Sequence, residues 1–118
     1  MPVAACSIAP PSGTAKITVA IPSQFRGVWD ADATACGAVA SDMRQHIGSD
    51  GMRFGDVVGE ARRVVRDNNQ SVSVFTSFVS DGDPWEEEVR LTLSLTGDEL
   101  TIRTSDNSTT RARCPSSN

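Results

Sequence analysis

Apolar and polar side chains alternate along much of the chain beyond residue 16. The alternation is clearest at residues 89–95, where four aliphatic side chains share one parity and three polar side chains share the other. Because successive side chains of a strand point to opposite faces, this pattern predicts a strand with one buried and one solvated face. Turn residues interrupt the pattern about every 8–12 positions, which is typical of antiparallel all-β domains.

The neighbouring segments extend this strand into a meander. Residues 71–80 are rich in β-branched and aromatic side chains, and the Asp-Gly-Asp-Pro turn at 81–84 separates them from the strand at 89–95. Turns are also predicted at 96–99 and 106–108, before strands at 100–103 and 111–114. The last part of the chain is therefore predicted to form four consecutive antiparallel strands.

The middle of the chain is less regular. The turn-like residues 48–51 predict a hairpin that joins short strands at 46–47 and 52–54. Residues 57–66 fit either a strand or a helix, because Ala61, Val64 and Val65 have helical spacing while nearby glycines and β-branched residues disfavour a helix. Residues 31–43 lack alternation and are predicted to form a loop holding a short helical turn.

Composition limits the size of the core and the class of partner. The chain has 118 residues, of which 38% are hydrophobic and 5% aromatic, and it contains no tyrosine. Its 15 acidic residues exceed its 11 basic ones, so we expect no nucleic-acid partner. Residues 1–15 are predicted to be a flexible tether, and residues 16–118 a single domain.

Residues 21–30, Ile-Pro-Ser-Gln-Phe-Arg-Gly-Val-Trp-Asp, carry a family resemblance. A Gly-x-Trp at the start of the first strand, after a short turn with a Phe, resembles the first signature of lipocalin-like (calycin) barrels. The resemblance implies that Trp29 closes one end of the barrel and that an arginine of the last strand packs across its ring, next to a backbone that Gly27 allows to approach closely. Arg111 and Arg113 are both candidates for that arginine.

The order of the later motifs is closer to small exported proteobacterial proteins of undefined function. A Cys, a Met-x-Phe strand, a late Trp-x-Glu and a terminal Arg-Cys follow the signature, so the resemblance covers residues 21–114. It implies an all-β, antiparallel up-and-down barrel of about eight strands, lipocalin-like. Lipocalins proper are much longer, and their second signature, Thr-Asp-Tyr, has no counterpart in a chain without tyrosine.

An eight-stranded barrel has an interior just wide enough for its own side chains or one small ligand. The aliphatic side chains predicted to fill this interior are Val72, Val74, Leu91, Leu93, Leu95, Leu100 and Ile102. A shallow pocket at the open mouth is the functional alternative. Its candidate contacts are Met52, Phe54, Phe75 and Phe78, and Trp85 is a further candidate contact for a ligand or partner.

The amino terminus and the three cysteines indicate export. Residues 3–6, Val-Ala-Ala-Cys, resemble the lipobox that precedes the acylated cysteine of bacterial lipoproteins, although a chance match in a flexible tail is the alternative. If Cys6 is acylated, Cys36 and Cys114 remain as one pair, predicted to form a disulfide rather than two separate thiols. We therefore expect a bacterial periplasmic or envelope protein, attached to a membrane only through a lipid at Cys6.

No segment indicates catalysis or a cofactor. His46 is the only histidine, and its neighbours show neither a nucleophile nor an orienting group. The acidic run at 81–88 lacks the calcium-loop spacing, and the cysteines and His46 lack paired zinc-ligand spacing, so no metal is predicted. Trp85 lies within that acidic run and is a candidate recognition residue for a basic protein.

The sequence thus predicts a non-catalytic envelope protein that binds a small apolar or amphipathic ligand or an envelope partner. Two alternatives stay open. One is an inhibitor of a basic hydrolase such as lysozyme, based on Trp85 and the acidic net charge of −4. The other is an uncharacterised structural role.

Overall fold

The computed structural model describes residues 17–18, 20–38 and 43–115, and almost all of its regular structure is β. The predictions made on residues 1–15, including Cys6, lie outside the described residues. The elements are β1 (Ile17–Thr18), η1 (Ser23–Phe25), β2 (Gly27–Asp30), α2 (Ala33–Cys36), β3 (Gln45–Ile47), β4 (Gly51–Phe54), β5 (Val57–Asn68), β6 (Ser71–Ser80), β7 (Asp83–Leu93), β8 (Glu99–Arg103) and β9 (Ser108–Arg113).

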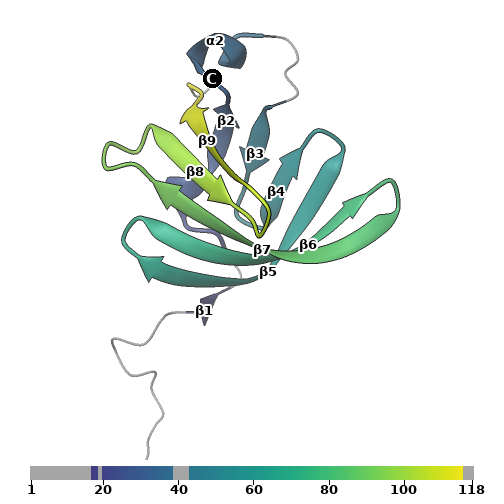
Figure 1. Ribbon diagram of the computed structural model, residues 1–118. Helices are drawn as coiled ribbons and strands as arrows, with labels where there is room; N and C mark the ends of the chain where they lie inside the picture. The colour runs from purple at the N-terminus through teal and green to yellow at the C-terminus, as the bar shows by residue number, and fades with distance from the viewer. Residues whose placement is uncertain (1–16, 19, 39–42, 116–118) are drawn as a thin grey trace, which may run out of the picture.

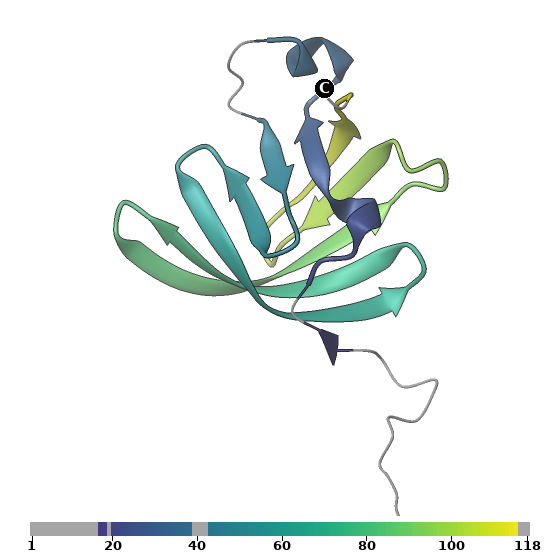
Figure 2. The same ribbon diagram turned by 180° about the vertical axis from the view of Figure 1, so that it is seen from behind.

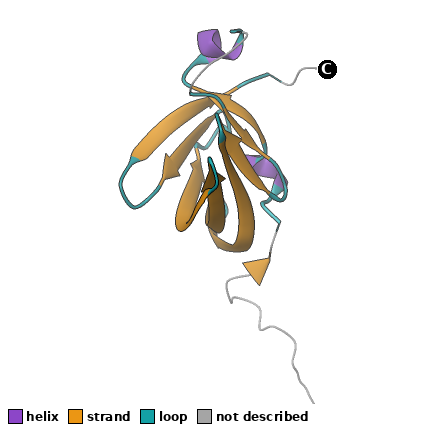
Figure 3. Cartoon of the chain, turned by 90° about the vertical axis from the view of Figure 1, so that its right-hand side faces the viewer, coloured by secondary structure: helices purple, strands orange, loops and turns teal. Residues whose placement is uncertain are grey.

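The strands form a closed antiparallel barrel (Figures 1 and 2). From β2 to β9 each strand pairs with the next in the sequence, and β9 pairs back with β2, so eight strands close an up-and-down barrel. β1 adds to the edge of β5 beyond the end of β4. The predicted fold class is confirmed. Figure 3 shows the two short helical segments outside the layer of strands.

The segment that fitted both a strand and a helix is the long strand β5. A β-bulge lies between Ala61 and Arg63, where the register against β6 shifts by one residue. Because a bulge inserts one extra residue, Ala61 and Val64 both face the core although they are three positions apart. The helical spacing of these two residues is therefore a product of the bulge.

The interior is filled by side chains of one parity on each strand. Six of the seven aliphatic residues predicted for the interior are buried. The exception is Leu95, which is 91% exposed. Leu95 was expected to continue β7, but β7 ends at Leu93 and the chain turns, with Gly97 N donating to Ser94 O at 3.0 Å.

The turn between β6 and β7 is also tighter than predicted. Asp81 and Gly82 have φ angles of 53° and 83°, and they form the whole connection. Positive φ at both central positions is typical of the two-residue turns that match the twist of a hairpin. Asp83 and Pro84, predicted as turn residues, therefore belong to β7, which becomes eleven residues long.

Gly51 permits the close approach of β4 to β5. A Cβ at this position would lie 2.0 Å from the backbone oxygen of Gly59. We expect Gly51→Ala to lower the free energy of unfolding by at least about 2 kcal/mol in urea denaturation, because two paired backbones would have to separate. Gly48→Ala is the matched control: its Cβ would meet nothing nearer than 4.0 Å, so equal losses in both variants would contradict this explanation.

Candidate functional site

One end of the barrel is sealed by Trp29 and Arg113. Trp29 is fully buried, and the Arg113 guanidinium carbon lies 4.2 Å from the centre of an indole ring. The guanidinium also donates to three backbone oxygens, those of Gly97 (2.9 Å), Arg26 (3.1 Å) and Gln24 (2.8 Å). Of the two candidate arginines, Arg113 therefore packs across Trp29. The assignment of Arg111 to this closure is wrong, because its side chain lies elsewhere on the inner face.

The turn between β7 and β8 binds Arg113 through hydrogen bonds. Asp98 O accepts a hydrogen bond from Arg113 N at 2.9 Å, and the Asp98 carboxylate accepts from the hydroxyls of Thr96 and Ser94. The hydrogen bond from Thr96 is the main reason that the pKa of Asp98 lies below its ordinary value, and the nearby Arg113 charge adds to the effect. An ionised Asp98 therefore keeps this turn ordered around Gly97, whose oxygen binds Arg113.

A disulfide fastens the loop after β2 to the end of β9. Cys36 and Cys114 are bonded, which confirms the predicted pair. The expected helical turn is α2, capped by Asp32, whose carboxylate accepts from Ala35 N at 2.8 Å. An ion pair that was not predicted lies nearby: Arg44 Nε donates at 2.9 Å to Asp30, whose side chain is completely buried.

The opposite end of the barrel holds a hollow of about 170 Å³. Its walls combine apolar and polar side chains from β3, β4, β8, β9 and the adjoining loops. The lining residues are Met43, Gln45, Phe54, Ile102, Thr104, Asn107, Thr109 and Arg111. This mixture could hold an apolar group and fix its orientation through hydrogen bonds.

Gln45 is the most informative residue of the hollow. Its side chain faces inward, and the residue is only 4% exposed. Its amide nitrogen contacts the Met52 sulfur at 3.8 Å, and no other group within the described part of the chain bonds to the side-chain amide. Buried amides normally have strong hydrogen-bond partners, and the amide oxygen of Gln45 can accept a hydrogen bond from a group placed in the hollow.

Arg111 adds donors to the same hollow. Its Nε donates to Met43 O at 3.1 Å, which holds the side chain across the opening. Within residues 20–38 and 43–115, no acceptor binds its two terminal guanidinium nitrogens. A guanidinium held in this way can donate two hydrogen bonds to a carboxylate, phosphate or sulfonate.

An aromatic row extends from the hollow along the inner wall. Phe54 meets Phe78 edge to face, with ring centroids 5.8 Å apart, and Phe78 stacks on Trp85 at 5.4 Å. Phe78 and Trp85 are cross-strand partners, so both side chains lie on the inner face. Phe78 is buried, whereas Trp85 is 40% exposed and ends the row.

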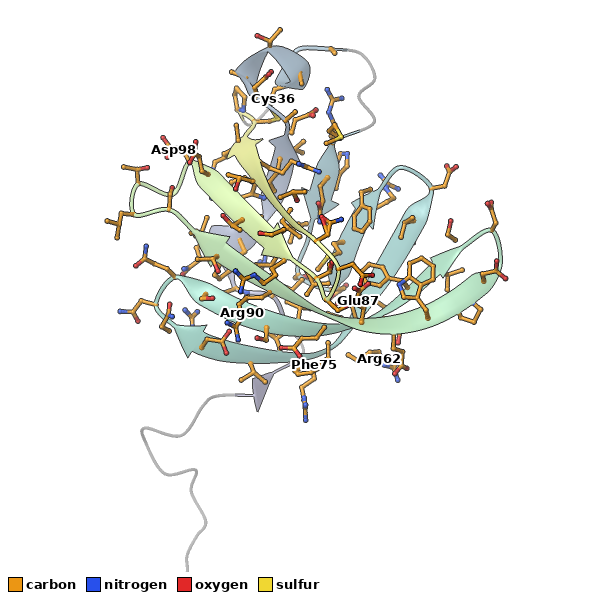
Figure 4. All side chains as sticks on the ribbon, in the orientation of Figure 1. Cys36, Arg62, Phe75, Glu87, Arg90 and Asp98 are labelled. Atoms are coloured by element: carbon orange, nitrogen blue, oxygen red, sulfur yellow. A yellow bond between two sulfur atoms is a disulfide. The ribbon has the colours of Figure 1, made fainter. Side chains whose placement is uncertain are left out.

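Two of the predicted mouth contacts lie elsewhere. Phe75 is on the outside of the barrel, where Arg63 stacks 4.4 Å above its ring; Figure 4 shows it pointing away from the interior. It was misplaced because residues 71–80 carry apolar side chains at both parities. Met52 is buried beneath Gln45 as part of the core and does not line the hollow. His46 is exposed on the outer face of β3.

Comparisons of the chain with protein families, with curated proteins and with solved structures find no match. The closed barrel alone does not identify a family, so the lipocalin-like resemblance stays a prediction. No helix among the described residues is long and apolar enough to cross a membrane.

Proposed function

We propose that this is a non-catalytic binding protein whose barrel mouth takes a small amphipathic molecule. The observation that carries the proposal is Gln45, a buried amide that faces the hollow and has only a sulfur contact. An unpaired buried polar group destabilises a fold, and an apolar side chain at this position would avoid that cost. A ligand that donates to Gln45 explains why the amide is there.

The walls of the hollow indicate the chemistry of the ligand. The volume of about 170 Å³ is below the roughly 300 Å³ at which enclosed drug-sized sites begin, so part of the ligand lies outside the hollow. Phe54 and the exposed ring of Trp85 offer a surface for an aromatic or aliphatic part. Gln45 accepts a hydrogen bond from the ligand, and Arg111 donates to an anionic group. The ligand class is thus a compact amphiphile with an N–H or O–H and an anionic end.

The proposed location is the bacterial periplasm or cell envelope, with a lipid anchor at Cys6. The Cys36–Cys114 disulfide supports an oxidising compartment. The lipobox-like residues before Cys6 and the Pro- and Ser-containing stretch after it support the anchor. Binding at the mouth does not depend on this anchor.

The test uses anilinonaphthalene sulfonate, a fluorescent probe with aromatic rings, an N–H and a sulfonate. We expect Gln45→Leu and Arg111→Gln each to weaken probe binding about tenfold, equivalent to 1.4 kcal/mol. Gln45→Leu should at the same time leave the free energy of unfolding unchanged or raise it by up to about 1 kcal/mol, because an unpaired amide is removed.

The control is His46→Leu, a change on the same strand and the opposite face. It should leave probe affinity unchanged. If the probe binds all three variants and the unchanged protein equally, or if Gln45→Leu destabilises the fold while binding is retained, Gln45 has a structural role and the proposal is wrong.

A further inference from the structure

The first half of β7 has an unpaired edge. β6 pairs with β7 from Asp83 to Thr92, but β8 on the other side pairs only from Arg90 to Leu93. Across residues 83–89, the described part of the chain makes no backbone hydrogen bond on that side. Figure 1 shows the β6–β7 hairpin extending beyond β8. An open barrel edge of this kind can accept another strand.

The hydrogen-bonding direction along β7 identifies the groups that this edge offers. Leu93 N donates to Gln70 O, so odd-numbered residues of β7 turn their backbone groups toward β6. Ser94 N donates to Glu99 O on the opposite side, as the alternation requires. The register between β6 and β7 has no shift, so the N–H and C=O groups of Glu86 and Glu88 face the free edge.

Space for an added strand lies beside these groups. A shallow hollow of about 510 Å³ separates the free edge of β7 from the turn after β8. Glu86, Glu87, Glu88 and, at one end, Arg90 line one side of it, and Arg103, Thr104 and Ser105 line the other. A 3.4 Å hydrogen bond from the Ser105 hydroxyl to the Glu87 carboxylate is the one side-chain hydrogen bond across it among the described residues.

We infer that this edge binds an extended basic peptide segment of a partner protein, which adds as a short strand beside residues 84–88. Backbone groups of Glu86 and Glu88 would pair with the peptide, and the carboxylates would pair with lysine or arginine side chains across the new ladder. Charge complementarity selects this occupant, since three successive glutamates line the edge. Beyond Glu88, Arg90 of β7 pairs with Arg103 of β8, so the acidic stretch ends where the β7–β8 pairing begins.

The test is a titration of the ¹⁵N-labelled full chain with a synthetic octapeptide of alternating lysine and threonine. We expect the amide signals of Glu86 and Glu88 to shift. N-methylation of alternate residues in the peptide retains its charge but removes hydrogen-bond donors. Two such peptides are compared, one methylated at its odd-numbered residues and one at its even-numbered residues. The peptide whose methyl groups face β7 should bind at least about tenfold more weakly than the other.

Protein variants separate backbone pairing from charge. Glu88→Pro removes an edge donor that β6 does not use, whereas the matched variant Glu88→Gln removes only the charge. We expect Glu88→Pro to weaken binding about tenfold and Glu88→Gln to weaken it less. The methylated peptides keep the test decisive if Glu88→Pro does not fold.

Three results would overturn the inference. The first is no binding, in which case the glutamates only keep the edge from pairing. The second is equal affinity for both methylated peptides and the unmodified one, which indicates charge attraction without strand addition. The third is a concentration-dependent shift of the Glu86 and Glu88 amides without peptide, which indicates that a second copy of the chain occupies the edge.

Discussion

Trp29→Ala should lower the free energy of unfolding by about 3–5 kcal/mol, the usual loss when a large buried aromatic side chain is removed. Trp29 is fully buried, its indole N–H donates to Phe25 O at 3.1 Å, and Arg113 stacks on its ring. The variant would leave a cavity at the closed end and remove the surface on which Arg113 lies. Urea denaturation followed by far-ultraviolet circular dichroism measures the loss.

Trp85→Ala is the control for that measurement. Trp85 is 40% exposed and stacks on one ring face of Phe78, so its removal should cost about 1 kcal/mol or less. Equal losses for the two tryptophans would contradict the assignment of Trp29 to barrel closure and Trp85 to the mouth.

Removal of the disulfide should produce a loss of similar size. In the chain-entropy account, a bond between residues 78 positions apart stabilises the fold by about 4 kcal/mol, because it restricts the unfolded chain. We expect the double variant Cys36→Ser, Cys114→Ser to lose about this amount in urea denaturation. Reduction of the unchanged protein is the control and should give the same loss. A loss below about 1 kcal/mol in both would show that the bond adds little to the fold.

Much of the barrel could be predicted from the sequence because its strands have one buried face. β-branched and aromatic residues located β6, alternation located the last five residues of β7 and most of β8, and the turn residues separated these strands. The errors fall where a local feature breaks the period of two. The bulge near Arg62 makes β5 resemble a helix, and the turn after Leu93 exposes Leu95, which has the parity of the buried residues.

The candidate site was only partly predictable. Phe54, Phe78 and Trp85 were selected as large apolar side chains, and the structure brings them into one row. Gln45 was missed although a signal existed: it shares the parity of Ile47 on β3, which places an amide among inward apolar side chains. The choice between Arg111 and Arg113 depends on how far each lies along β9, and parity alone does not determine it.

We propose that the mouth binds a small amphiphile, and the most direct test is native mass spectrometry of the protein purified without denaturation from the organism that encodes it. We predict ions that carry one bound small molecule for the unchanged protein and for His46→Leu, with strongly reduced occupancy in Gln45→Leu and Arg111→Gln. Spectra that show only the bare chain for the unchanged protein, or equal occupancy in all four proteins, would contradict the account.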